Sequence, residues 1–157
     1  MRVNKITPSL LSNKSILKPR NLSKIPDVLI YSKSPNERVM IDTKRSVIVG
    51  RMYIELRRTF AYIGELYINF AERNKGYGKK FLDYAQNYSR INGRKGNLRL
   101  LAGAMGVESK SPHAFYRKYG FTSYDTKRIA EIDSYIKNNQ ELPQLYPSMN
   151  LYYEPAK

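Results

Sequence analysis

The sequence predicts an α/β (α+β) fold with a mixed, mostly antiparallel central sheet and flanking helices. Short apolar or alternating runs between residues 27 and 70 are separated by turn residues, which indicates consecutive antiparallel strands. An amphipathic run at 79–91 then predicts a helix, because its apolar residues recur every three to four positions. The apolar run 98–102 follows this helix, so we expect it to lie parallel to the strand before the helix.

The chain divides at Pro26 into a basic arm and a folded domain. Residues 1–26 contain no acidic residue and have prolines at 8, 19 and 26, which do not suit an amphipathic helix. With 157 residues, of which 41% are hydrophobic, the chain can bury a continuous core. The sequence therefore predicts an irregular basic arm at 1–26 and a single domain at 27–157. Organellar targeting is an alternative role for the arm.

The first half of the domain is rich in strands. The apolar runs predict strands at 28–31, 38–42, 46–57 and 61–70. Thr43-Lys44-Arg45 separates the second strand from the third, which indicates a hairpin. In the third strand Met52, Ile54 and Leu56 alternate with polar or aromatic residues, so one face of the strand is expected to be buried.

The second half alternates strands and helices. Gly93 is expected to end the helix 79–91, and Gly120 a short helix that starts after Ser111-Pro112. Ser111 is a candidate helix cap. The remaining predicted elements are a strand at 98–102, a strand at 121–124, a helix at 126–139 and a strand at 149–153.

The junction between the strand 61–70 and the next helix is suited to binding a diphosphate. The first turn of a helix has backbone N–H groups without partners and a partial positive charge. Gly76 and Gly78 have no Cβ atom to keep a bulky anion from the backbone. Arg73, Lys75 and Lys79 add positive charge. The segment therefore predicts an anion-binding loop.

Composition narrows the classes of function. The chain has no cysteine, which excludes disulfides, thiolate metal sites and a cysteine nucleophile, and its one histidine excludes a histidine-rich metal site. No apolar run approaches the length of a membrane span. We therefore expect no metal and no membrane association. A cytoplasmic location is predicted.

The formal net charge of +15 is concentrated before residue 124. A polyanionic partner such as RNA, a ribosome or an anionic membrane surface would explain it. An anionic cofactor together with a solvated Lys-rich surface is the favoured explanation, because no compact Lys/Arg tract stands out. The sequence leaves both readings open.

Two separated motifs carry a family resemblance. The first is the segment 65–78, which ends in Arg73-Asn74-Lys75-Gly76-Tyr77-Gly78, and the second is His113-Ala114-Phe115-Tyr116-Arg117-Lys118-Tyr119-Gly120-Phe121. In this order, with a helix and a strand between them, the motifs resemble those of the GNAT superfamily of acyl-CoA-dependent N-acetyltransferases. The resemblance covers residues 47–121, and the predicted order of elements extends it to the C-terminus.

The resemblance implies a site for acetyl-CoA. In the family, this loop wraps the coenzyme A diphosphate, the end of the preceding strand bonds the pantetheine arm, and that strand splays from its parallel neighbour to admit the cofactor. The residues that match these cofactor-binding positions are Tyr67, Ile68, Arg73, Asn74, Lys75, Gly76, Tyr77, Gly78 and Lys79. Ser109 stands where many members have an asparagine that contacts the cofactor arm. Asn74 replaces a frequent glycine, and Phe70 a frequent proline.

The resemblance also implies direct acetyl transfer to an amine, without an enzyme nucleophile. Tyr116 matches the tyrosine that often serves as general acid, although packing with Phe115 and Phe121 would also explain it. Glu65 is the candidate for positioning or deprotonating the amine, with a salt bridge as the competing reading. Glu55 is a weaker second candidate. His113 could be a base or simply a residue of the helix N-terminus.

The leading hypothesis is an acetyl-CoA-dependent N-acetyltransferase. The alternative is a basic RNA- or ribosome-binding protein on the same fold with little catalysis. The sequence does not identify the amine acceptor. In the family, segments near the early strands determine which acceptor binds. No helices are predicted before residue 38 here, so we expect the acceptor-binding side of the protein to be open. An open side slightly favours a macromolecular acceptor.

Overall fold

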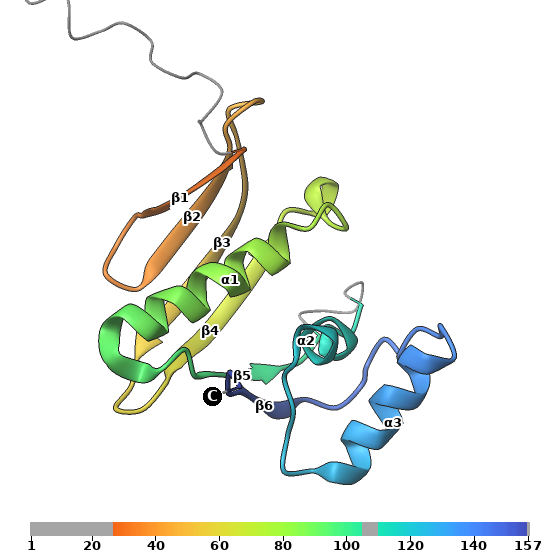
Figure 1. Ribbon diagram of the computed structural model, residues 1–157. Helices are drawn as coiled ribbons and strands as arrows, with labels where there is room; N and C mark the ends of the chain where they lie inside the picture. The colour runs from red at the N-terminus through yellow and green to blue at the C-terminus, as the bar shows by residue number, and fades with distance from the viewer. Residues whose placement is uncertain (1–26, 105–109, 157) are drawn as a thin grey trace, which may run out of the picture.

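The computed structural model describes residues 27–104 and 110–156 (Figure 1). They form a six-stranded sheet in the order β1-β2-β3-β4-β5-β6, in which β4 and β5 are parallel and all other neighbours antiparallel. The strands are β1 (Val28–Ser32), β2 (Glu37–Asp42), β3 (Val47–Leu56), β4 (Ala61–Ile68), β5 (Leu98–Ala102) and β6 (Met149–Tyr153). This confirms the mixed, mostly antiparallel sheet with one parallel pair. The predicted arm at 1–26 and Ser109 lie outside the described residues.

Three helices accompany the sheet. They are α1 (Tyr77–Ser89), α2 (His113–Tyr119) and α3 (Thr126–Lys137), with a 3₁₀ turn at Phe70–Glu72 and a wide π turn at Arg90–Arg94 after α1. In Figure 1, α1 runs across one face of the sheet, whereas α2 and α3 lie beside β5 and β6. The predicted helices are confirmed within about two residues at their ends, the usual uncertainty of helix boundaries.

Two local predictions are wrong. Residues 121–124 form no strand, because after a single bridge between Thr122 and Tyr152 the chain turns away and Asp125 caps α3 by accepting a hydrogen bond from Arg128 N. Ser111 does not cap α2. Its hydroxyl instead donates to the carbonyl of Pro143 at 2.6 Å, so it ties α2 to the segment before β6.

The core lies between α1 and the sheet. Phe81, Leu82 and Ala85 of α1 are fully buried in one cluster with Met52 and Ile54 of β3. Burial of such side chains contributes about 1.5–3 kcal/mol each. These contacts confirm the predicted period of α1 and the predicted burial of one face of β3, and they fix α1 to the centre of the sheet.

A bulge in β4 alters the expected direction of its side chains. Tyr53 pairs with Glu65 but Ile54 pairs with Ile63, so Gly64 is an extra residue in β4. Directly opposed residues share a face of the sheet. Ile63 therefore faces the core, whereas Glu65 lies beside Tyr53 on the face away from α1. Simple alternation along β4 would put Glu65 and Ile63 on one face, but the inserted residue Gly64 reverses the alternation between them.

The parallel pair separates at the same place. β4 pairs with β5 only at residues 61–63, opposite 98–100, although both strands continue. Residues 64–68 keep β3 as their neighbour on one edge and have no strand partner among the described residues on the other. The bulge therefore lies where β4 and β5 part, and we call this interruption of the pairing the opening in the sheet.

Gly50 lets β3 approach the end of β4. A Cβ atom at residue 50 would lie 2.4 Å from the carbonyl oxygen of Tyr67, which is backbone and cannot turn aside. We expect Gly50→Ala to lower the free energy of unfolding by about 2 kcal/mol or more, since overpacking against backbone forces the strands apart. Urea unfolding measures this. Gly64→Ala, where the nearest atoms are 3.9 Å away, should cost clearly less.

Candidate active site

The segment before α1 presents a row of backbone N–H groups without acceptors. Arg73 N donates to Phe70 O and Lys80 N donates to Gly76 O, but among the described residues no acceptor is bonded to the N–H groups of 74–79. Asn74 and Gly76 have positive φ angles of 61° and 83°. Left-handed residues of this kind turn successive N–H groups toward one concavity, where they can bind an anion.

A side-chain network holds the base of this loop. Arg45, in the β2–β3 hairpin, donates to both carboxylate oxygens of Glu72, at 3.0 and 2.6 Å, and also to Asp42. Tyr77 donates its hydroxyl proton to Asp42 at 2.8 Å. The side chain of Tyr77 is therefore buried in this network, and only its backbone N–H is left to contact a cofactor.

The network should make stability depend on pH in the acid range. The Arg45 hydrogen bond, helped by Lys75, lowers the pKa of Glu72 from its usual 4.5 to about 2, and the Tyr77 hydrogen bond lowers the pKa of Asp42. A depressed carboxyl pKa stabilises the fold above the unfolded-state pKa, and this contribution is lost as the pH falls through the folded-state pKa.

We therefore expect Glu72→Gln to be less stable than the wild type at pH 6, and the difference to shrink between pH 4.5 and pH 2. Urea unfolding of both proteins at several pH values measures it. A difference that stays constant over this range would show that the carboxylate of Glu72 is not stabilised by its partners.

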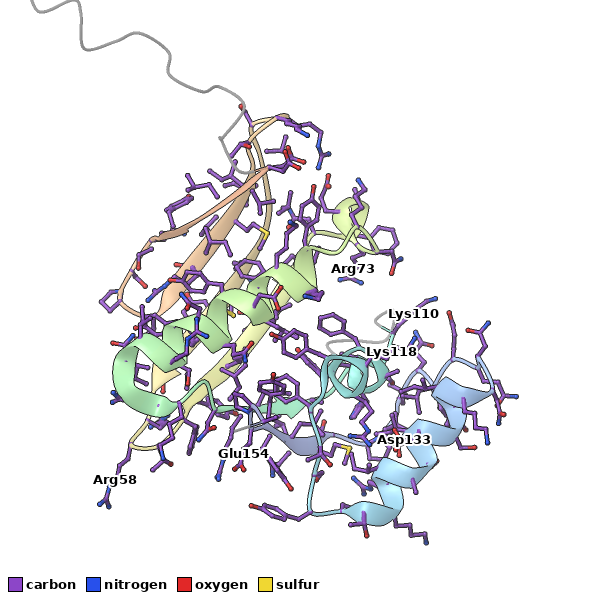
Figure 2. The ribbon with its side chains drawn as sticks, viewed as in Figure 1. Arg58, Arg73, Lys110, Lys118, Asp133 and Glu154 are labelled. Atoms are coloured by element: carbon purple, nitrogen blue, oxygen red, sulfur yellow. The ribbon has the colours of Figure 1, made fainter. Side chains whose placement is uncertain are left out.

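The charged side chains of the loop already have partners within the protein. Arg73 donates to Ile68 O at 3.1 Å and lies over the ring of Phe70, whose 81% exposure leaves the pair on the surface. Lys75 pairs with Glu72, and Lys79 with Asp83. Figure 2 shows Arg73 across from Lys110 and Lys118 of the α2 region. The loop can therefore bind an anion directly through its backbone N–H groups. Its charged side chains, which already have partners, contribute positive charge around that anion.

Tyr67 and Ile68 lie at the end of β4, on the part that is separated from β5. A strand edge without a partner presents backbone N–H and C=O groups that an extended amide chain can pair with. Arg73, which donates to Ile68 O, joins the loop 73–78 to this free edge of β4.

Tyr116 lies in α2 with 8% of its surface exposed, packed edge-on against Phe121. Its ring contacts Phe115 and Phe121, and its hydroxyl makes no hydrogen bond with any described residue. Burial raises the pKa of Tyr116 to about 12, so the phenol is protonated at neutral pH. It can act as a proton donor but not as a base.

Glu65 makes the ion pair that the competing reading anticipated, with Arg51 at 3.2 Å. It nevertheless lies next to the bulge, on the face of the sheet opposite Tyr116 and α1. Glu55 pairs with Arg57 on the surface and has no link to the opening. Of the two carboxylates, only Glu65 borders the place where β4 leaves β5.

His113 does not qualify as a base. It is fully buried, its Nε2 lies 3.1 Å from Pro147 O, and burial lowers the pKa of the imidazole. Sequence reasoning missed Phe115, whose ring would lie 2.9 Å from a Cβ at residue 78 and so closes one side of the loop. It also missed the Gly64 bulge. An isolated glycine within a strand was the available signal for that bulge.

An anion cradle beside a splayed parallel pair, with a buried tyrosine on the next helix, is the arrangement of an acyl-CoA site. A family model described as the acetyltransferase (GNAT) domain matches residues 35–123, more than half of the chain. The chain belongs to this GNAT acetyltransferase family. Its fold and its two motifs agree with that membership.

Individual relatives are similar at lower coverage. YhdJ of Bacillus subtilis, named an uncharacterized N-acetyltransferase, is 39% identical over 62 residues, which are 39% of this chain and 41% of YhdJ. The chain thus spans about two fifths of the length of this curated relative.

Two solved structures resemble the fold. A Bacillus anthracis protein named for streptothricin acetylation, solved with acetyl coenzyme A, has a TM-score of 0.53 and 18% identity over 80% of this chain and 66% of that one. PaiA N-acetyltransferase of Thermoplasma acidophilum, solved with coenzyme A, also has a TM-score of 0.53, with 16% identity over 82% and 62%. At such identities the similarity establishes the fold alone.

In the described parts of the chain, no three His, Cys, Asp or Glu side chains gather as a metal site would require. None of the described helices is long and apolar enough to cross a membrane.

Proposed function

We propose that the protein is an N-acetyltransferase that moves an acetyl group from acetyl-CoA to an amine by direct transfer. The observation that carries the proposal is the row of unbonded N–H groups at 74–79 beside the free edge of β4. Membership of the GNAT family, and relatives solved with coenzyme A or acetyl coenzyme A, support this choice of donor.

The residues fit the parts of the cofactor. The N–H groups of 74–79 would bind the diphosphate, and no atom within 4 Å of a Cβ position at Gly76 obstructs it. The free edge at Tyr67 and Ile68 would pair with the amides of the pantetheine arm. Arg73, Lys75 and Lys79 would add favourable charge. A contact between Ser109 and the pantetheine arm is proposed from the motif alone.

When bound, acetyl-CoA supplies a thioester whose C–S bond breaks as an amide bond forms. The amine must lose a proton, and the departing sulfur gains one. Tyr116 holds a phenolic proton with no competing acceptor among the described residues and would donate it to the sulfur. Glu65, on the opposite face, would orient the amine or take its proton, directly or through water. The two proposed roles would thus act from opposite faces of the sheet.

The acceptor is an amine, and we favour a macromolecular one slightly, because residues 33–36 form only a short turn between β1 and β2, with no helix between these strands. The charge of +15 would also suit an acceptor joined to RNA or a ribosome. A purely RNA-binding protein on this fold is not supported by the family membership. The proposed domain is 27–157, and its proposed location is the cytoplasm.

A screen of amines, peptides and aminoacyl-tRNA with labelled acetyl-CoA tests the reaction. We expect label on one class of amine, with loss of label when Tyr116 is replaced by Phe. Binding comes first: acetyl-CoA should raise the melting temperature, and no shift at millimolar acetyl-CoA would contradict the proposal.

A further inference from the structure

A hollow of about 650 Å³ lies on the face of the sheet away from α1. Its floor is formed by β5 and β6, and its sides by the start of β4 and the N-terminal end of α3. This volume is within the range of small-ligand sites. None of the residues assigned above to acetyl-CoA lines it.

Arg99 stands in the middle of this hollow among aromatic rings. Tyr62 of β4 and Tyr152 of β6 are its direct cross-strand partners, so the three side chains lie side by side on one face. The Arg99 guanidinium lies 4.4 Å from the centre of the Phe60 ring. Tyr124 extends the row, with its ring 4.8 Å from that of Tyr152. We call Tyr62, Arg99, Tyr152 and Tyr124 the aromatic row.

Arg99 differs from other arginines on this side in having no acidic partner. Arg51 pairs with Glu65, Arg57 with Glu55, and Arg128, in the same hollow, with Asp125. The Arg99 guanidinium lies over the Phe60 ring and makes no hydrogen bond or ion pair with any of the described residues. A guanidinium held in place by a ring, with its N–H groups unused, can bind a carboxylate or phosphate in bidentate fashion.

The row lies next to the opening in the sheet. Tyr62 and Arg99 are one pair before the last one that joins β4 to β5, and the opening begins beyond it. From Arg99 to Leu101, the first residue of β5 past the pairing, is about 7 Å along the strand. A molecule of moderate size seated on the row could therefore extend into the opening from the side of Glu65.

We propose that this hollow binds the part of the acceptor that bears the amine, and that this part has a flat or apolar body with a carboxylate or phosphate. The anion binds Arg99, the body lies against the rings, and the amine reaches the opening. The identification of the occupant as the acceptor rests on the proposed function. The existence of the binding site does not, because it is argued from the aromatic row alone.

The test is an NMR titration of the ¹⁵N-labelled full chain with benzoate, phenyl phosphate and the neutral probe benzamide. We expect each anion to bind about tenfold more tightly than benzamide, with the largest amide shifts at residues 99, 150 and 152. The stronger of the two anions identifies the acceptor's group as carboxylate or phosphate. Arg99→Gln should remove the preference for anions. Arg58→Gln, an exposed arginine in the neighbouring β3–β4 turn (Figure 2), should keep it.

Equal affinity for benzamide and both anions, or an anion preference that survives Arg99→Gln, overturns the site. Its role as acceptor site is tested with coenzyme A present. Nuclear Overhauser contacts are expected between the CH₂ of 4-(aminomethyl)benzoate and the thioethylamine protons of coenzyme A. Binding on the row without such contacts overturns that role alone. Failure of coenzyme A to bind contradicts the proposed function. In that case the titrations with benzoate, phenyl phosphate and benzamide still decide whether the hollow is an anion-binding site.

Discussion

Gly76→Glu is expected to weaken acetyl-CoA binding by about a hundredfold, or about 2.7 kcal/mol. The carboxylate would stand where the diphosphate meets the N–H groups of 74–79, and the lost charge-assisted hydrogen bonds and the added repulsion act together. Isothermal titration calorimetry measures the affinity. The side chain itself meets open space, so the fold should tolerate it apart from the strain of a φ of +83°.

Gly93→Glu is the matched control. Gly93 has a φ of +79° and equally has no atom within 4 Å of its Cβ position, but it lies at the opposite end of α1. Both variants should lose similar stability, and only Gly76→Glu should lose affinity. Equal affinity in the two variants would mean that the loop does not bind the diphosphate.

Tyr116→Phe should lower kcat by about a hundredfold while acetyl-CoA binds as before. General acid catalysis typically contributes this much, and the ring's packing on Phe121 does not need the hydroxyl. Stability should also be nearly unchanged, because the hydroxyl has no hydrogen-bond partner among the described residues. Steady-state kinetics with an amine that the wild type acetylates, together with calorimetry, separates the two effects.

Tyr119→Phe controls for the loss of a hydroxyl from the same helix. Tyr119 donates to Asp83 of α1 at 2.9 Å, so its loss should reduce stability slightly and leave kcat unchanged. A Tyr116→Phe enzyme with normal kcat, or one that loses stability as Tyr119→Phe does, would assign Tyr116 to packing instead of proton donation.

The sheet and helices could be predicted because their patterns are local. The alternation of Met52 and Ile54, the period of Phe81 and Ala85 in α1, and Gly120 at the end of α2 each depend on a few neighbouring residues. The bulge at Gly64 could not be derived in this way. Whether a glycine inserts into a strand depends on the register with β3, which is a contact between distant parts of the chain.

The same limit explains the site. Backbone positions of the loop followed from the motif, since Gly76 and the first turn of α1 are contiguous in sequence. The partners of the side chains could not be predicted from the motif. Tyr77 donates a hydrogen bond to Asp42, 35 residues away, and Glu65 forms an ion pair with Arg51. Arg99 and its rings come from β4, β5, β6 and the turns that precede β4 and α3, so no single stretch of sequence signals them.

The most direct test of the central claim is an NMR titration of the backbone amides of 74–79 with coenzyme A, using pantetheine, which lacks the diphosphate, for comparison. Amide protons that gain a charge-assisted hydrogen bond to phosphate should move downfield, with Gly76 and Gly78 easily recognised as glycines. We predict these shifts with coenzyme A and their absence with pantetheine. Coenzyme A binding that leaves the amides of 74–79 unshifted would contradict the account.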